Sequence, residues 1–299
     1  MNRPKLILLC GLPGAGKTHF AQKLLQDSCY RDKTVHLSSD AIRAELWGNE
    51  AIQGDNNEVF NLIRSRALEA LNNGQNVIYD STAMSRKDRS AIISVCPKFA
   101  EIVCYVIWAP IEVCIERDAA RERTVGKEVI DRMLKRFQAP FVDEGFNSIF
   151  VHCTVEPFDV EKYFQDIVEA MKIPHDNPHH TLDVFDHCCE AARYIDARDV
   201  DWDIWYAAVL HDVGKPRCKA FLDSQNNPSE QAHFYQHQCV GAYMVYGLYK
   251  VASRLNAPAI AWLISTHMDP YLNTKYYRNL PTYLKQKIDL LHEADVAAH

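Results

Sequence analysis

The residues with the clearest chemistry lie near the N-terminus, where a glycine-rich turn leads into a lysine and a threonine. Gly11, Gly16, Lys17 and Thr18 fit the spacing G-x-x-x-x-G-K-[ST], and an apolar run over residues 5–10 precedes them. Glycines let successive backbone N–H groups point at phosphate oxygens, and a helix that starts at the lysine adds its positive dipole end. The lysine would reach the β- and γ-phosphates of ATP, and the threonine hydroxyl would hold Mg²⁺. We therefore expect a strand, a phosphate-binding loop and a helix. The predicted nucleotide contacts of this loop are Gly11, Pro13, Gly14, Ala15, Gly16, Lys17, Thr18 and His19.

Two carboxylates follow later predicted strands. Asp40 comes shortly after a predicted strand at 34–38, and Asp80 ends another at 76–80. Phosphoryl transfer needs a carboxylate near the acceptor hydroxyl as a base or a positioning group, and Asp40 suits that role. The alternative is that Asp40 or Ser39 caps the next helix.

Histidines and aspartates recur in the second half, near the ends or on the faces of predicted helices. Imidazole and carboxylate ligands suit Mn²⁺, Fe²⁺, Co²⁺, Ni²⁺ or Zn²⁺. His233 and His237 are four residues apart on a predicted helix over 232–251, which would place them on the same face. His233 is interpreted as a surface or supporting residue, because one helix face needs to supply only one ligand. The candidate ligands are His187, His211, Asp212, His237, His267 and Asp295.

The elements that would position these residues divide the chain in two. Predicted strands alternate with helices up to residue 171, which is typical of a parallel sheet with helices on both faces. In such a sheet the phosphate loop, Asp40 and Asp80 gather at the carboxyl ends of the strands. After Ile173 the strands stop and helical patterns continue. We therefore expect an α/β domain over 1–173 and an all-α domain over 174–299.

Composition narrows the classes of function. The 299 residues suit two domains, and the net charge of −6 excludes a uniformly basic nucleic-acid binder, so contacts with nucleic acid must rest on local basic patches. Ten cysteines without a C-x-x-C pair indicate reduced thiols. No apolar run approaches a membrane span, and the first strand leaves no room for a signal peptide. We expect a cytoplasmic protein without membrane contact.

Residues 5–139 resemble the P-loop kinases of the 5′-hydroxyl polynucleotide kinase type. The resemblance implies that Asp40 takes the proton from the attacking 5′-OH and that Arg43 contacts the acceptor phosphate. It also implies that Arg117 and Arg121, one helical turn apart, form a lid that clamps the phosphates of ATP. An exposed helix face with charges at i and i+4 is the alternative for these two arginines. The motifs that carry the resemblance are the phosphate loop, Asp40-Ala41-Ile42-Arg43 and the run over 116–123.

Residues 180–298 resemble the HD phosphohydrolase superfamily, and in particular the HD domain of bacterial tRNA nucleotidyltransferases. Such domains hydrolyse phosphomonoesters and 2′,3′-cyclic phosphates with one or two divalent metal ions. The resemblance implies a core metal site of His187, His211, Asp212 and Asp295, a second metal at His237 and His267, and contact of Lys215 with the scissile phosphate.

Together the two halves resemble bifunctional enzymes that heal nucleic-acid ends. The hypothesis is an ATP-dependent 5′-OH kinase joined to a metal-dependent 2′,3′-cyclic phosphodiesterase or 3′-phosphatase. Its partners would be polynucleotide ends, RNA in preference to DNA, with an RNA ligase acting downstream. One alternative is a nucleoside or metabolite kinase fused to an HD nucleotidase. Another is that the HD half only senses nucleotides or docks RNA.

Overall fold

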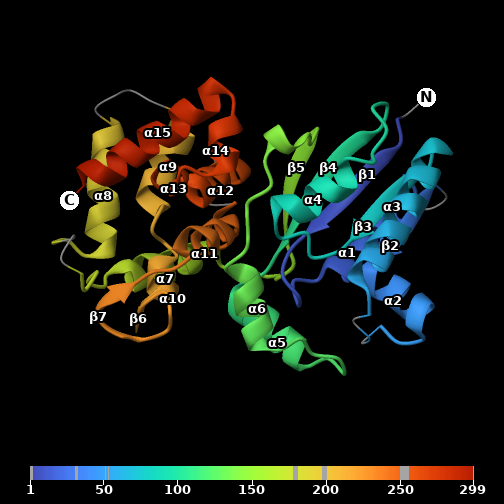
Figure 1. Ribbon diagram of the computed structural model, residues 1–299, viewed down its shortest axis with the longest axis horizontal. Coiled ribbons are helices and arrows are strands. Elements are labelled where there is room, and N and C mark those ends of the chain that lie inside the picture. The colour runs from blue at the N-terminus through green and yellow to red at the C-terminus, as the bar shows by residue number, and fades with distance from the viewer. Residues whose placement is uncertain are drawn as a thin grey trace. The chain divides into compact units, whose positions relative to one another are not determined.

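The computed structural model describes residues 3–30, 33–50, 52, 54–177, 181–196, 201–249 and 256–298. It forms two compact units (Figure 1). The first contains Met1–Met133 and Pro140–Glu156, and the second contains Leu134–Ala139 and Pro157–His299. This division differs from a boundary at residue 173, because helix α7 (Val160–Met171) is part of the second unit.

The first unit is built on a five-stranded sheet in the order β2-β3-β1-β4-β5. Every neighbouring pair is parallel. The central strand is buried along Leu6–Cys10, as expected for a strand covered on both faces. The predicted parallel α/β architecture is confirmed. The strands are β1 (Lys5–Cys10), β2 (Thr34–Ser38), β3 (Asn76–Asp80), β4 (Glu101–Trp108) and β5 (Ser148–Cys153).

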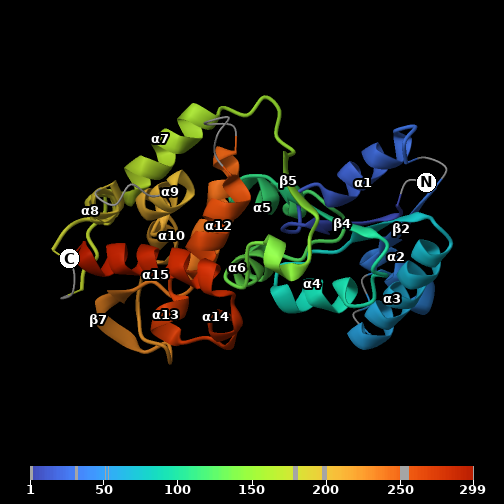
Figure 2. The ribbon, with the colours of Figure 1, turned by 90° about the horizontal axis from the view of Figure 1, so that it is seen from above.

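Helices cover both faces of this sheet. Figure 2 shows α1 on one side of the strands and α3 and α4 on the other. The longest, α3, buries the predicted stripe of Val59, Ile63, Ala67 and Leu71. The helices are α1 (Lys17–Gln26), α2 (Ser39–Trp47), α3 (Asn56–Asn72), α4 (Arg86–Ile93), α5 (Ile111–Ala119) and α6 (Lys127–Leu134), with a 3₁₀ turn η1 at Val142–Glu144.

The second unit is helical, as predicted, apart from one short hairpin. Beyond α7 its elements are α8 (Val184–Asp196), α9 (Trp202–Leu210), α10 (Lys215–Cys218), β6 (Ala220–Leu222), β7 (Pro228–His233), α11 (His237–Met244), η2 (Val245–Leu248), α12 (Ala257–Thr266), α13 (Asp269–Leu272), α14 (Lys275–Asn279) and α15 (Thr282–Ala297). Among the described helices of the whole chain, none is long and apolar enough to cross a bilayer.

The predicted helix over 232–251 is wrong in its first part. β6 and β7 pair as an antiparallel hairpin, and Asp223 closes the turn by accepting backbone hydrogen bonds from residues 225 and 227 at 2.8 Å each. Gln236 then adopts a left-handed conformation (φ 64°), so the chain turns before α11 begins. The predicted end of this helix, at residue 251, lies outside the described residues.

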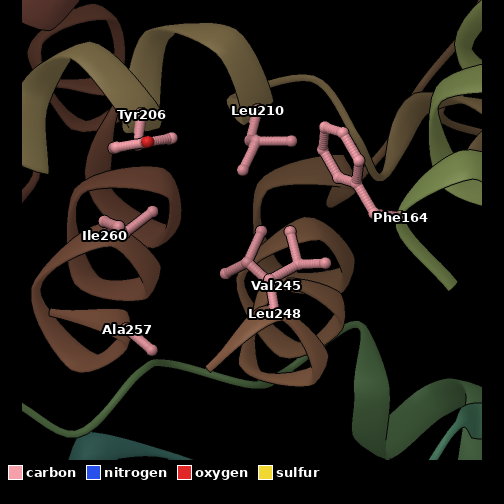
Figure 3. A pocket seen from close by; sticks show the side chains of 7 residues that line it. All are labelled: Phe164, Tyr206, Leu210, Val245, Leu248, Ala257 and Ile260. Carbon is pink, nitrogen blue, oxygen red and sulfur yellow. The ribbon is translucent and has the colours of Figure 1, made fainter. Parts of the chain in front are cut away.

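Helix α7 packs on the second unit through an apolar face. Phe164 lies beside Leu210 and Val245 around a cavity of about 50 Å³ (Figure 3). Tyr163 donates a hydrogen bond to the carbonyl oxygen of Met244 at 3.1 Å. These contacts explain why α7 belongs to the helical unit although it follows the last strand of the sheet.

Candidate functional site

The phosphate loop joins β1 to α1 and depends on its glycines. Gly14 and Gly16 have left-handed backbone conformations, with φ of 79° and 95°. A Cβ atom at Gly14 would lie 2.1 Å from the carbonyl oxygen of Cys114, so no larger residue fits there. Lys17 Nζ donates to the carbonyl oxygens of Gly11 and Leu12 at 3.0 and 2.9 Å, within the loop that it would serve.

Thr18, Asp80 and His36 form a polar chain beside the loop. The Thr18 hydroxyl donates to Asp80 Oδ2 at 2.9 Å, and His36 Nε2 lies 3.2 Å from the same oxygen. Burial favours the neutral carboxyl group, but the His36 hydrogen bond, the Lys17 charge and the Thr18 hydroxyl together hold the pKa of Asp80 below its usual value. A carboxylate beside the threonine is the arrangement that a magnesium–nucleotide complex requires.

A cleft of about 520 Å³ opens in front of these residues. It brings together groups from the ends of β1, β2 and β3 and from the segment after α5, as the parallel sheet predicts. Three functional parts line it: the loop residues Pro13, Gly16, Lys17 and Thr18; Asp40, Arg43, Ser81 and Thr82; and Arg121 and Arg123.

Asp40 is available for a role in this cleft, because another residue caps α2. The N-cap is Ser38, whose side chain accepts from the backbone N–H of residue 41. Asp40 Oδ1 instead lies 3.2 Å from Arg43 Nη1 and 3.3 Å from Arg123 Nη1. Arg43 is largely buried and also donates to Asn56 Oδ1 at 2.9 Å, which fixes its guanidinium at the rim.

The two predicted lid arginines have different surroundings. Arg121 is exposed and lines the cleft. Arg117 donates to the hydroxyl and the carbonyl oxygens of Thr154 at 2.8 and 3.0 Å. Thr154 in turn donates to the carbonyl oxygen of Ala15 at 2.8 Å, so Arg117 is linked to the phosphate loop through this threonine. His19 is exposed on α1 and is not among the described residues that line the cleft.

In the second unit, five elements bring the predicted metal ligands together. Four of them form the first set: His187 from α8, His211 and Asp212 from the end of α9, and Asp295 from α15. His187 Nε2 lies 3.0 Å from Asp295 Oδ1 and 3.3 Å from His211 Nε2. His211 Nε2 lies 3.3 Å from one oxygen of each aspartate.

The second set shares Asp212 with the first. Asp212, His237 at the start of α11 and His267 at the end of α12 form this group. His237 Nε2 lies 3.1 Å from His267 Nε2 and 3.1 Å from Asp212 Oδ1. Because Asp212 Oδ2 faces the first set, its carboxylate lies between the two groups. We call the six residues of both sets the His/Asp cluster.

A backbone carbonyl group orients the ring of each histidine in the cluster. Their Nδ1 atoms lie 2.8–3.1 Å from backbone carbonyl oxygens, which can only accept, so each Nδ1 is the protonated nitrogen. The four Nε2 atoms then point at one another and at carboxylates. Such an arrangement is repulsive unless a cation lies among them, and separations of 3.0–3.6 Å are those of ligands that share one ion. The residues therefore fit a divalent metal ion, and a second ion at the other set.

The titration of these buried groups agrees with a cation site. Burial would lower the pKa of His211, but the charge of Asp212 raises it well above its usual value. Burial would likewise raise the pKa of Asp212, but His211 and Lys215 hold it well below the usual range. The pKa of His267 falls to about 3, mainly through burial and then through the neighbouring His237. His267 is thus a neutral ligand at physiological pH.

Lys215 extends the cluster with a positive charge. Its Nζ lies 2.6 Å from Asp212 Oδ2 and 3.1 Å from His175 Nε2. His175 is buried, its Nδ1 bonds to the carbonyl oxygen of Leu182, and burial and Lys215 lower its pKa to about 4. His175 could not be predicted as part of the site, since it precedes the helices and fits no spacing. His233 lies apart, at the end of β7, where its Nε2 is 3.1 Å from the Ser229 hydroxyl.

A phosphate loop beside a cleft is typical of enzymes that transfer phosphoryl groups. A buried His/Asp cluster with a lysine is typical of enzymes that hydrolyse phosphate esters. Residues 6–140 match the family model described as an AAA domain, and residues 179–297 match that of the HD domain. The chain therefore carries a P-loop kinase domain followed by an HD domain, as the resemblances implied. The first residues of the HD match, 179 and 180, lie outside the described residues.

Curated relatives of this chain include a transcription factor and a kinase, each matched over part of its length. The transcription factor bHLH140 of Arabidopsis thaliana is 26% identical over 151 residues, which cover 48% of this chain and 15% of that protein. The L-seryl-tRNA(Sec) kinase of Methanococcus maripaludis is 26% identical over 173 residues, which cover 55% of this chain and 65% of that protein. The chain thus spans less than two thirds of either relative.

Solved structures similar to this chain include a Pnkp1/Rnl/Hen1 RNA repair complex and a gluconokinase from Sinorhizobium meliloti. The first is 22% identical with a TM-score of 0.41, over 46% of this chain and 44% of the other. The second is 17% identical with a TM-score of 0.37, over 52% of this chain and 86% of the other.

Proposed function

We propose that this protein heals broken polynucleotide ends, preferably of RNA. The kinase domain would transfer the γ-phosphate of ATP to a 5′-OH end. The HD domain would hydrolyse a 2′,3′-cyclic phosphate or a 3′-phosphate at the other end. The products, a 5′-phosphate and a 3′-OH, are the ends that a ligase joins.

The observation that carries this proposal is the pairing of two opposed chemistries on one chain. The cleft of the first unit is lined by groups suited to adding a phosphoryl group, and the His/Asp cluster by groups suited to removing one. On one small molecule these reactions would cancel each other. At a strand break they act on different ends and both lead toward ligation.

In the kinase cleft each residue would have a distinct task. Lys17 would bind the β- and γ-phosphates, Thr18 would hold Mg²⁺ and Arg121 would neutralise the transferred phosphoryl group. Asp40 would accept the proton of the attacking hydroxyl. Arg43, which is fixed by Asn56, would hold the acceptor's phosphate beside Asp40.

In the HD domain the two ligand sets would hold divalent metal ions of the Mn²⁺, Fe²⁺, Co²⁺, Ni²⁺ or Zn²⁺ type. Such ions supply a bound water of lowered pKa and polarise the phosphoryl oxygens. Asp212 would be a ligand in both sets, because one of its carboxylate oxygens faces each set. Lys215 would bind the phosphate, and His175 would orient the lysine from the other side.

Acceptor choice tests the kinase half. Transfer from ATP would be measured to a 5′-OH RNA strand, to a 5′-OH DNA strand and to free nucleosides, with wild type and Asp40→Asn. We expect transfer to the strands, RNA before DNA, and loss of this transfer in the variant. Transfer to nucleosides alone would contradict the proposal.

A nucleoside or metabolite kinase fused to an HD nucleotidase is the second candidate, and the net charge of −6 favours it. The dependence of substrate affinity on salt concentration distinguishes the two candidate functions. Strand binding releases counterions and weakens steeply as salt rises, whereas a small substrate loses much less affinity.

A further inference from the structure

A continuous segment of the second unit, residues 270–287, is basic and rich in tyrosine. It has four Lys or Arg, four Tyr and no Asp or Glu, in a chain with 33 Lys and Arg against 39 Asp and Glu. Helices α13 and α14 and the start of α15 carry it. Four exposed residues of this segment, Tyr271, Lys275, Arg278 and Tyr283, are called the basic–aromatic surface below.

The two tyrosines of this surface offer open rings. Tyr271 is 65% exposed and Tyr283 is 61% exposed. The Tyr271 ring meets the His292 ring edge to face, with centroids 5.0 Å apart. Exposed aromatic rings that are supported in this way stack on unpaired nucleobases.

The cations of this segment are available to anions. Lys275 and Arg278 are exposed on α14. Arg278 donates to the carbonyl oxygen of Asn273, and Lys285 donates to that of Arg278 at 2.6 Å. In the described part of the chain, none of these three cations forms an ion pair with a carboxylate, unlike Lys287, which pairs with Asp201 at 2.7 Å.

The surface adjoins the His/Asp cluster at two points. Helix α13 starts two residues after His267. His292, which contacts Tyr271, lies one helical turn before Asp295 on α15. The Asp295 side chain is 15% exposed, against 0–2% for the other three members of its set. Asp295, one turn from the residue that contacts Tyr271, is thus the member of its set most open to solvent.

We propose that the basic–aromatic surface binds a single-stranded polynucleotide and leads its phosphate-bearing end to the His/Asp cluster. Bases would stack on Tyr271 and Tyr283, and phosphates would contact Lys275 and Arg278. A duplex would not bind in this way, because its bases are already stacked inside. This inference rests on the proposed function, since it names the site that would hold the strand during hydrolysis.

Fluorescence anisotropy of a short labelled single-stranded RNA tests the surface in the full chain. We expect Tyr271→Ala and Tyr283→Ala each to weaken binding about tenfold, and Tyr271→Phe to retain it. The double variant Lys275→Ala/Arg278→Ala should lower the slope of log affinity against log salt by about 1.4, since each phosphate contact on a single strand contributes about 0.7. Matched controls are Phe221→Ala, an exposed ring on β6, and Lys162→Ala/Lys172→Ala, on α7 and at its C-cap, which should bind as wild type does.

The outcomes separate this inference from the proposed function. Wild-type affinity and salt slope in both tyrosine variants and in the double variant would overturn the inference, even if the enzyme heals ends. Absence of RNA binding by wild type, or equal binding of a blunt duplex, would also overturn it. If the RNA binds here but its ends remain unmodified, the inference stands and only the proposed function fails.

Discussion

Asp212 lies between the two histidine sets, with one carboxylate oxygen facing each. Because this shared carboxylate is charged and His267 is neutral, we expect the cluster to hold two cations instead of one. An Asp212→Asn chain keeps the shape but loses the charge. We expect it to lose metal from both sets, whereas His267→Ala should lose metal from the second set only.

Metal content by mass spectrometry, after dialysis against Mn²⁺, measures this difference. The expected order is wild type first, then His267→Ala, then Asp212→Asn near zero. Asp186→Asn, an exposed carboxylate on α8, is the matched control and should retain the wild-type content. Equal metal content in Asp212→Asn and wild type would show that the sets do not depend on Asp212.

In the proposed kinase reaction, Asp40 is the residue that accepts the proton. Its neighbours Arg43 and Arg123 hold it at the cleft, and Ser38 relieves it of the capping role. If it serves as the base, Asp40→Asn should lower kcat for phosphoryl transfer by about 10²–10⁴-fold with little change in ATP affinity. Steady-state kinetics with a 5′-OH strand would measure this, with Glu45→Gln on the same helix as the control. A kcat within a few-fold of wild type would exclude Asp40 as the base.

Single residues could be predicted where their types and spacing are restrictive. The loop glycines and Lys17 have such spacing, and so do the six cluster residues. The structure brings the members of each set together within their own unit. His175 and Thr154 could not be predicted, because their partners, Lys215 and Ala15, lie 40 and 139 residues away. Only the fold creates such contacts.

At the scale of elements, two glycines let the turn after α9 approach α11. A Cβ atom at Gly214 would lie 2.1 Å from the carbonyl oxygen of His237, and one at Gly241 would lie 3.0 Å from Val213. This close approach sets Asp212 beside His237. It gives a physical reason for glycines at both positions.

We therefore expect Gly214→Ala to lower the free energy of unfolding by about 1–3 kcal/mol, because the backbone of α11 must move. Gly241→Ala meets the Val213 side chain at 3.0 Å and the Gly214 backbone nitrogen only at 3.2 Å, and should cost less. Urea unfolding of the two variants gives the comparison. Equal stability of Gly214→Ala and wild type would mean that the approach of turn and helix is not as close as described.

Helices and strands with a clear hydrophobic pattern could be predicted from the sequence. Those whose bounds depend on the backbone conformation of a turn could not. The predicted strands at 34–38, 76–80 and 101–108 have the observed bounds, because each is a short segment rich in β-branched or aromatic residues between turns. The hairpin of β6 and β7 was missed, since the polar residues of β7 carry little strand signal. The predicted helix over 232–251 starts before Gln236, whereas α11 starts after it. A hydrophobic pattern does not reveal the left-handed conformation of Gln236.

At the scale of the whole molecule, we expect the two units to use different ions. Mg²⁺ prefers oxygen ligands and suits a threonine with nucleotide phosphates, whereas histidine-rich sets select transition metals. After complete chelation, Mg²⁺ alone should restore the kinase activity but not the hydrolysis, and Mn²⁺ should restore the hydrolysis. Measuring both activities across the two additions tests this separation. Restoration of hydrolysis by Mg²⁺ alone, to the level reached with Mn²⁺, would contradict it.

The central claim is that two independent sites act on the two ends of one strand. Its most direct test uses an oligonucleotide with a 5′-OH and a 2′,3′-cyclic phosphate, incubated with ATP, Mg²⁺ and Mn²⁺, with both ends resolved by mass. We expect wild type to add a 5′-phosphate and open the cyclic phosphate, Lys17→Ala to lose only the first reaction, and Asp212→Ala to lose only the second. Consumption of ATP or free nucleotides by wild type with both strand ends unchanged would contradict the account.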